Sequence, residues 1–211
     1  KGIYGTLLLG THDTTFKRSH SKIDIFNDLA GDIKNILHGE NRMRDFIGYT
    51  TPELNGRLSA TFNAMKGTDG SENNSLLDST SFSLNYKTKL LHAALSIDSE
   101  VKGYDSSRIS ISFPFNKANL GFIYQDTKNL STGIKERGHV VSVSRRVGDG
   151  GNLKFQIAKS DMKINSGRQT SFGYDYNLSQ EVKIFFFYTD LTGKDNTKEK
   201  EIRAIGFEYK F

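Results

Sequence analysis

Three aspartates recur at every fourth position of one segment, and carboxylates so placed are the first side chains to consider for chemistry. Asp24, Asp28 and Asp32 would share one face of a helix, because residues four apart are neighbours on a helix surface. Another face of that helix would be apolar, with hydrophobic residues at helical spacing: Phe26, Leu29, Ile33, Ile36 and Leu37. The acids could be solvated on a surface helix, or they could face a confined polar channel. Spacing alone leaves both interpretations open.

Side chains for covalent catalysis are not grouped in the sequence. The histidines lack the spacing of metal ligands, and they are His12, His20, His38, His92 and His139. No Gly-x-Ser-x-Gly elbow and no Walker-type phosphate loop occurs. Cysteine is absent, which excludes disulfides and thiolate metal sites. The sequence therefore predicts neither an enzyme nor a cofactor or metal.

Charge and hydropathy limit the classes of partner that the chain could bind. The chain of 211 residues has 29 basic and 24 acidic side chains, a net charge of +5 that is spread along its length. A nucleic-acid binder would cluster its bases on one face, so no nucleic-acid partner is predicted. No apolar run approaches the ~18 residues of a membrane helix. A membrane β-strand escapes that test, because only every second residue faces lipid.

The end of the chain alternates strictly between apolar and polar residues. From Ile205 to Phe211 the odd positions are Ile, Phe or Tyr, and the even positions are Gly, Glu and Lys. A period of two is that of a β-strand with one apolar face. Similar segments recur along the whole chain, and we count twelve: residues 3–11, 43–51, 56–66, 79–87, 89–98, 107–115, 118–126, 137–147, 152–160, 168–177, 181–190 and 200–211.

This pattern predicts an all-β, antiparallel fold, but alternation does not say which face of the sheet is wet. A soluble barrel or sandwich would turn the apolar face inward. Here the polar set is rich in Ser, Gly, Asn and charge, which suits a water-filled lumen. The connections also alternate between short turns and long polar loops, as in outer-membrane barrels. We therefore predict an antiparallel transmembrane β-barrel.

One connection, residues 12–42, is far longer than a usual loop and carries the aspartates. We interpret it as a loop with a short helix that folds inside the barrel. Acids on such a loop, opposite bases on the wall, would create a transverse field that orders polar solutes. Each base could equally form a salt bridge at the rim. By strand parity the inward bases are Arg42, Arg44, Arg57, Arg108, Lys154 and Lys183.

Two segments resemble those of the Gram-negative general porins. Gly5-Thr-Leu-Leu-Leu-Gly-Thr-His-Asp13 is similar to the strand that leads into the family's third loop. Ile47-Gly-Tyr-Thr-Thr-Pro-Glu-Leu-Asn-Gly56 is similar to the strand and tight periplasmic turn that follow. Segment 12–42 between them then resembles the constriction loop of the family. The last strand, which ends at Phe211, resembles the terminal strand with its assembly signal.

The resemblance implies a fold and a function. General porins are sixteen-stranded homotrimers of the bacterial outer membrane, through which small hydrophilic solutes and ions diffuse passively. The lipid bilayer and those solutes are then the expected partners. The resemblance places Arg42 and Arg44 where the loop re-enters the wall, and it assigns the pore acids to Asp24, Asp28, Asp32 and Glu40.

The strand count departs from the family, because the chain begins at the strand that would be the fifth. We expect a single domain over residues 1–211 that lacks about four N-terminal strands. A complete twelve-stranded barrel is the alternative, since it too has an even strand number. Two other functions also stay open. One is a soluble β-barrel or sandwich that binds a ligand, and the other is a plugged outer-membrane barrel that acts as an adhesin or a sleeve for a partner.

Overall fold

The fold is a sheet of twelve strands in chain order. A computed structural model describes residues 1–66, 78–163, 166–195 and 198–211, so one of the long polar loops expected between the strands, at 67–77, lies outside the described residues. The strands are β1 Thr6–Asp13, β2 Arg42–Thr50, β3 Leu58–Met65, β4 Ser79–Lys87, β5 His92–Val101, β6 Tyr104–Phe115, β7 Ala118–Asn129, β8 Lys135–Val147, β9 Gly151–Lys163, β10 Ser166–Asn177, β11 Val182–Thr192 and β12 Lys198–Tyr209.

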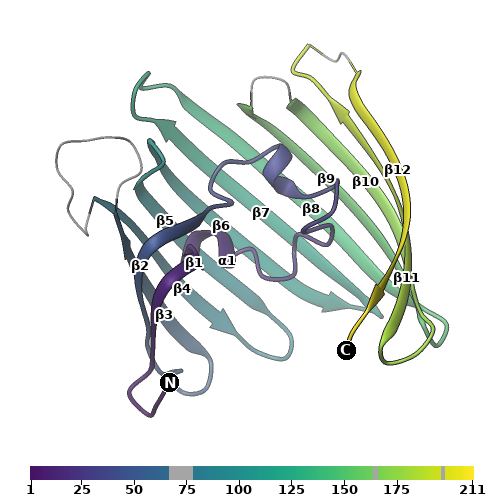
Figure 1. Ribbon diagram of the computed structural model, residues 1–211, viewed down its shortest axis with the longest axis horizontal. Helices are drawn as coiled ribbons and strands as arrows, with labels where there is room; N and C mark the ends of the chain where they lie inside the picture. The colour runs from purple at the N-terminus through teal and green to yellow at the C-terminus, as the bar shows by residue number, and fades with distance from the viewer. Residues whose placement is uncertain (67–77, 164–165, 196–197) are drawn as a thin grey trace. The chain divides into compact units, whose positions relative to one another are not determined.

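Each strand lies next to its neighbour in sequence, with β1 and β12 at the two ends of the order (Figure 1). The paired registers are antiparallel, from Thr6 opposite Thr50 in β1–β2 to Val182 opposite Tyr209 in β11–β12. The predicted all-β antiparallel fold is therefore confirmed. Two short helices, α1 (Thr15–Arg18) and η1 (Ile33–Asn35), both lie within the long connection. Among the described residues, no helix is long and apolar enough to cross a bilayer.

The chain divides into two compact units, each described by itself. In unit 1, α1 contacts the inner face of β3, β4 and β5. Thr14 caps this helix, because its hydroxyl accepts a hydrogen bond from the Lys17 amide at 3.1 Å. Beside it, Met43, Phe46 and Met65 belong to one buried apolar cluster. Unit 1 comprises residues 1–21, 38–111 and 123–137.

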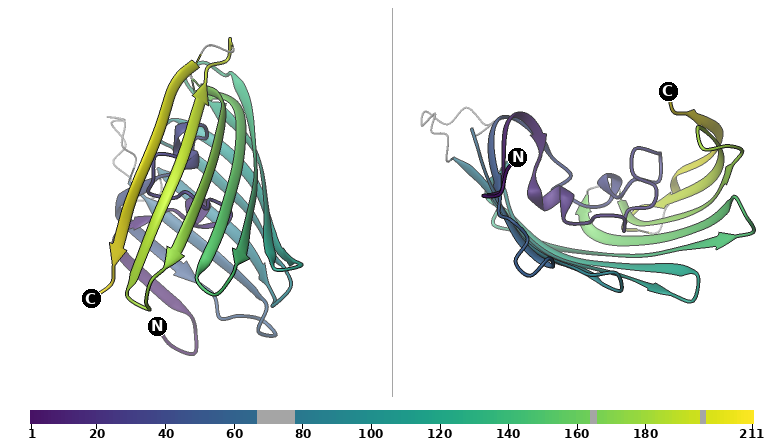
Figure 2. Two further views of the ribbon diagram at one scale, coloured as in Figure 1. Left: turned by 90° about the vertical axis from the view of Figure 1, so that its right-hand side faces the viewer. Right: turned by 90° about the horizontal axis from the view of Figure 1, so that it is seen from below.

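Unit 2 consists of the remaining strands and the middle of the long connection. Strands β9 to β12 lie side by side, and segment 22–37 rests on the inner face of β9 and β10 (Figure 2). Five apolar side chains of the segment are buried, namely Ile23, Phe26, Ile33, Ile36 and Leu37, while Ile25 and Leu29 are partly buried. Unit 2 comprises residues 22–37, 112–122 and 138–211.

The two faces of the sheet have the opposite polarity from those of a soluble protein. In unit 1, Phe82 is 42% exposed while the neighbouring Ser83 is fully buried. In unit 2, Phe155 is 40% exposed while Gln156 is 1% exposed. A soluble sandwich would bury the aromatic rings and expose the polar set. The observed arrangement suits strands with lipid on one side and a polar lumen on the other.

The predicted helix through the three aspartates is wrong. Asp28 has a φ of +64°, which belongs to the left-handed region and interrupts a right-handed helix. Asp24 and Asp32 instead turn their carboxylates onto nearby backbone amides, at Phe26 and Lys34 respectively. Such local bonds compete with helix formation, so the segment folds as turns and the single turn η1. Four of the five predicted apolar residues are buried and Leu29 is partly buried, but they do not form a helical stripe.

Candidate functional site: the long loop on the polar wall

A buried ion cluster in unit 1 holds the returning end of the long loop. Arg108 on β6 is 2% exposed, and its Nη2 lies 2.7 Å from Oε1 of Glu40. The other carboxylate oxygen of Glu40 lies 3.3 Å from Nε2 of His20. A buried guanidinium and carboxylate that bond directly offset part of the cost of removing both charges from water. The cluster therefore joins His20 and Glu40 of the loop to Arg108 on β6.

Arg108 makes further contacts with the loop backbone. Its Nη1 donates to the Phe16 carbonyl and its Nη2 to the His38 carbonyl, both at 3.3 Å. The guanidinium carbon also lies 4.3 Å above the centre of the Phe16 ring, a cation–π contact. Gln125 on β7 accepts from Arg108 Nε at 2.9 Å and donates to the His38 carbonyl at 2.9 Å. One arginine and one glutamine thus fix both ends of the loop in this unit.

Hydrogen bonds from the wall also fix helix α1. The Thr15 amide donates to Asn63 Oδ1 at 2.6 Å, and the Phe16 amide donates to Ser81 Oγ at 3.1 Å. These amides are at the start of the helix, where no carbonyl of the helix itself can accept from them. The inward polar residues of β3 and β4 therefore satisfy backbone groups of the loop.

The ion cluster gives a pH prediction. Burial raises the pKa of the Glu40 carboxyl, but Arg108 and then His20 lower it more, so this pKa lies below its usual 4.5. A lowered folded-state pKa means that the ionised group stabilises the fold above pH 4.5 and that this contribution is lost as the pH falls through the folded pKa. We expect the difference in urea midpoint between wild type and Glu40→Gln to shrink as the pH falls below about 5, towards the folded pKa of Glu40. A difference unchanged down to pH 3 would contradict the assignment.

A second buried acid in unit 1 has no such partner. Asp98 on β5 is 2% exposed, and neither carboxylate oxygen has a hydrogen-bond donor in suitable geometry among the described residues. A buried carboxylate without a good donor costs more than the about 1–3 kcal/mol of a neutral polar group, and Asp98→Asn removes its charge. We expect Asp98→Asn to raise the free energy of unfolding in detergent by an amount in that range at pH 8. Asp126→Asn, where the side chain is 47% exposed, is the control and should change it little; a loss of stability in Asp98→Asn would refute the prediction.

In unit 2 the loop is held mainly by one aspartate and two glutamines. Asp24 is buried, and its carboxylate accepts from the Phe26 and Ile33 amides at 3.2 Å and from Gln156 Nε2 at 3.1 Å. Gln156 on β9 also donates to the Gly31 carbonyl at 3.1 Å. Gln169 on β10 donates to the same carbonyl at 2.6 Å and accepts from Asn35 Nδ2 at 2.8 Å.

Apolar contacts complete this attachment where wall glycines leave room. A Cβ added at Gly173 on β10 would lie 2.9 Å from the Phe26 ring, and one at Gly138 on β8 would overlap the Leu37 side chain. Glycine in a strand marks such a close approach. Lys154 on β9 covers the other side of Phe26, with its ammonium 5.0 Å from the ring centre. The loop therefore packs closely against the strands in unit 2 as well.

The four predicted pore acids differ in their surroundings. Asp24 is buried in the hydrogen bonds described above, and Glu40 is paired with Arg108. Asp32 is 3% exposed, caps η1 and pairs with Lys34 Nζ at 3.3 Å. Only Asp28 of the four is exposed. Three of these acids therefore hold the loop, and a role in a channel field stays a prediction.

Two of the predicted inward bases do not follow the expected parity. Met43 and Phe46 are buried in one cluster although three positions separate them, and a regular strand would place them on opposite faces. The bulge is at Asp45, which has a φ of +48°. Arg42 and Arg44 therefore lie on the opposite face of β2 from Met43, and the prediction that they share the inward face is wrong. Arg42 instead lies 3.5 Å from Asp13.

Three of the other predicted residues lie in strands, and two lie just outside them. Arg108 and Lys154 are buried on the inner face, where Lys154 Nζ lies 2.8 Å from Asp175 Oδ1. Lys183 Nζ lies 2.6 Å from Glu208 Oε2. Two of them are exposed, namely Arg57 in the turn before β3 and Phe211 after β12. Their roles in pore lining and assembly stay predictions.

The sequence interpretation missed the neutral side chains that hold the loop. Gln125, Gln156 and Gln169 all contact loop carbonyls, and each is 1% exposed or less. A signal was present, because Gln125 and Gln156 lie at inward positions in the middle of strands whose other face is apolar. A long amide that can both donate and accept is suited to backbone groups of a loop that lies against the wall.

The whole sequence up to β11 matches one family model, that of the Gram-negative porins, over residues 1–196. The chain belongs to the Gram-negative porin family. No curated protein matches the sequence significantly. Family membership confirms the predicted resemblance and, with the fold, an outer-membrane porin channel located in the bacterial outer membrane.

Solved porin structures share the fold at low sequence identity. The anion-selective porin from Comamonas acidovorans superposes with a TM-score of 0.71 at 22% identity, over 99% of this chain and 70% of that one. OmpF of Salmonella typhi in complex with daunomycin gives 0.76 at 14% identity, over 98% and 74%. The trimer form of OmpT from Vibrio cholerae gives 0.64 at 11% identity, over 99% and 78%. At these identities the likeness concerns the fold alone.

Proposed function

We propose that this porin is a passive diffusion channel for small hydrophilic solutes and ions, and that segment 12–42 forms its constriction. The observation that carries the proposal is the attachment of this segment to the polar face of the sheet in each unit. In unit 1 it is held by Arg108 and Gln125, and in unit 2 by Gln156 and Gln169. A segment fixed on the wet face narrows the space through which a solute passes.

A polar lining favours polar solutes, because hydrogen bonds to the wall replace those that the solute made with water. The inner faces present hydroxyls and amides, and each unit adds charges of both signs, such as Arg108 with Glu40 and Lys154 with Asp175. An apolar solute cannot form hydrogen bonds with this lining, so the lining does not favour its passage. We infer that passage depends on size and polarity and needs no covalent step.

We further propose that the channel is a homotrimer. Support comes from the family and from OmpT of Vibrio cholerae, whose solved structure is named as a trimer form. Cross-linking of the folded protein in detergent should give a trimer band that disappears on heating. A protein that sediments as a monomer under the same conditions would refute this part of the proposal.

Reconstitution tests the channel. Folded protein in a planar bilayer should give discrete current steps in KCl, and liposomes carrying it should swell in small neutral sugars at rates that fall with sugar size. A barrel plugged as an adhesin or a partner sleeve would give neither result. A soluble binding module would stay in solution without detergent. Absence of steps from protein shown by circular dichroism to be folded would sink the proposal.

A further inference from the structure

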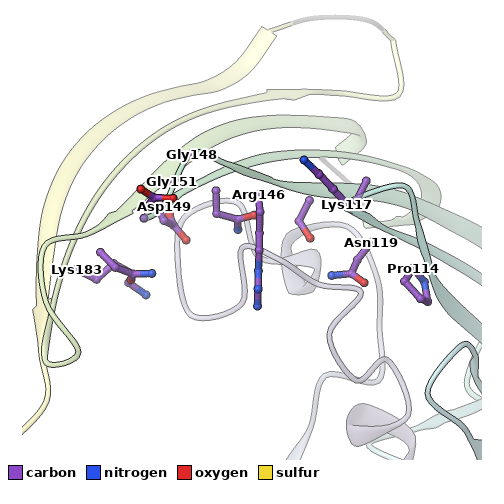
Figure 3. A pocket seen from close by; sticks show the side chains of 14 residues that line it. Pro114, Lys117, Asn119, Arg146, Gly148, Asp149, Gly151 and Lys183 are labelled. Carbon is purple, nitrogen blue, oxygen red and sulfur yellow. The ribbon is translucent and has the colours of Figure 1, made fainter.

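A pocket of about 720 Å³ lies in unit 2, on the inner face where the strands meet their short turns (Figure 3). Its wall is formed by β7 to β11 with the turn at 148–150 and the end of β6. The volume is in the range of pockets that hold a small organic molecule, roughly 300–1,000 Å³. None of the residues that hold the long loop contributes to this pocket, so it is a separate feature of the wall.

Arg146 on β8 occupies the middle of the pocket. Figure 3 shows its side chain extending into the space, with Lys183 on one side and Asn119 on the other. Its neighbour across the sheet, Asn152, also lines the pocket. In the part of the chain that the structure describes, no carboxylate lies within 4.0 Å of the Arg146 guanidinium, whereas the nearby Lys154 and Lys183 each have one. Arg146 thus offers a planar set of donors without a protein carboxylate to receive them.

The other groups in the pocket define what could bind. Lys117 adds a second cation, while Asn119 and Asn177 add amides that both donate and accept. Asp149 and Asp175 can accept from hydroxyls but would repel a second anionic group elsewhere on the ligand. A guanidinium fork matches a carboxylate or phosphate group in shape and charge. The set as a whole therefore suits one anionic head group on a body rich in hydroxyls.

We propose that this pocket is a binding site for small polyhydroxylated organic anions, such as sugar acids or sugar phosphates, with Arg146 as the group that binds the anionic head. The proposal rests on the channel function proposed above, since the pocket opens on the inner face. A solute held there pauses at the turn end of the channel before it leaves. The site thereby favours this class of solute over neutral sugars of equal size.

The structure supplies a matched control on the same strand. Arg145 precedes Arg146, is exposed, and does not line the pocket, because successive residues of a strand point to opposite faces. Arg145→Gln and Arg146→Gln remove the same charge from the same element. Any effect of net charge or of folding that is common to β8 will appear in both variants, whereas loss of the site will appear only in Arg146→Gln.

The test measures binding of gluconate, glucose 6-phosphate and neutral glucose to the folded protein in detergent at low salt, by titration calorimetry. We expect saturable binding of at least one of the two anions and none of glucose. We expect about tenfold or greater weakening in Arg146→Gln, as for loss of a hydrogen bond to a charged group, and wild-type affinity in Arg145→Gln. The stronger of the two anions identifies the head group.

Three results would overturn the site. They are no saturable binding of either anion, glucose bound as well as the anions, or equal weakening in both arginine variants. Current steps in KCl are recorded on the same preparations. If the channel conducts while no anion binds, the site alone is refuted. If binding is found without conductance, the proposed channel function fails and the pocket remains.

Discussion

Replacing Arg108 by methionine should destabilise the folded protein by about 3–5 kcal/mol, because it leaves the Glu40 carboxylate buried without its main partner. The same change removes the donors to the Phe16 and His38 carbonyls, so the loop should also become mobile. We expect a lower urea midpoint, followed by circular dichroism, and noisier single-channel currents.

The control is Arg137→Gln, which removes another arginine of unit 1 that pairs with an aspartate. Arg137 Nε lies 3.0 Å from Asp126 Oδ1, but its side chain is 75% exposed. Exposed pairs contribute about 0–1 kcal/mol. A similar loss of stability in both variants would show that burial of the Arg108 cluster does not determine the size of the effect. Adding Glu40→Gln to the Arg108 variant should recover part of the loss, because the unpaired charge is then gone.

Replacing Asp24 by alanine should be the next most disruptive change to the loop. Three donors lose their acceptor, namely the Phe26 and Ile33 amides and Gln156 Nε2. Buried donors without a partner cost about 1–3 kcal/mol each, and relaxation will recover some of this, so we expect a loss of about 3 kcal/mol. The loop should also open enough for trypsin to cut after Lys22 or Lys34, which wild type resists.

Asp28→Ala is the matched control, because Asp28 belongs to the same segment and has the same charge but is exposed. A surface substitution of this kind usually changes stability by no more than about 0.5 kcal/mol. If Asp28→Ala were cut as readily as Asp24→Ala, loss of negative charge rather than of buried hydrogen bonds would explain the result.

The strands were predictable from sequence because one face of each strand is apolar and the other is polar. A strand such as 152–160 alternates Phe155 and Ile157 with Lys154 and Gln156, and period two needs no knowledge of distant residues. The same rule failed in β2, where one extra residue at Asp45 reverses the faces on either side of it. A single bulge leaves the composition of a strand unchanged, so alternation cannot reveal it.

The loop was harder to predict because its structure depends on the wall. The hydrophobic spacing at Phe26, Ile33 and Leu37 predicted burial correctly, but the burial is supplied by Gly173 and Gly138 on strands far along the chain. Asp24 was assigned to the pore acids by resemblance to the general porins, and an aspartate is normally solvated. Only the position of Gln156 and of two backbone amides explains why it is buried.

The reversed polarity of the sheet has a consequence for how this chain reaches its membrane. Most strands alternate apolar and polar residues, as at Phe82 and Ser83, and the apolar run in β11, residues 184–188, is far shorter than the ~18 residues of a membrane helix. The unfolded chain can therefore travel through water, and a membrane met on the way has no continuous greasy segment to retain. Its apolar side chains gather on one surface only when neighbouring strands pair. Assembly of the sheet and entry into lipid are thus expected to be one event.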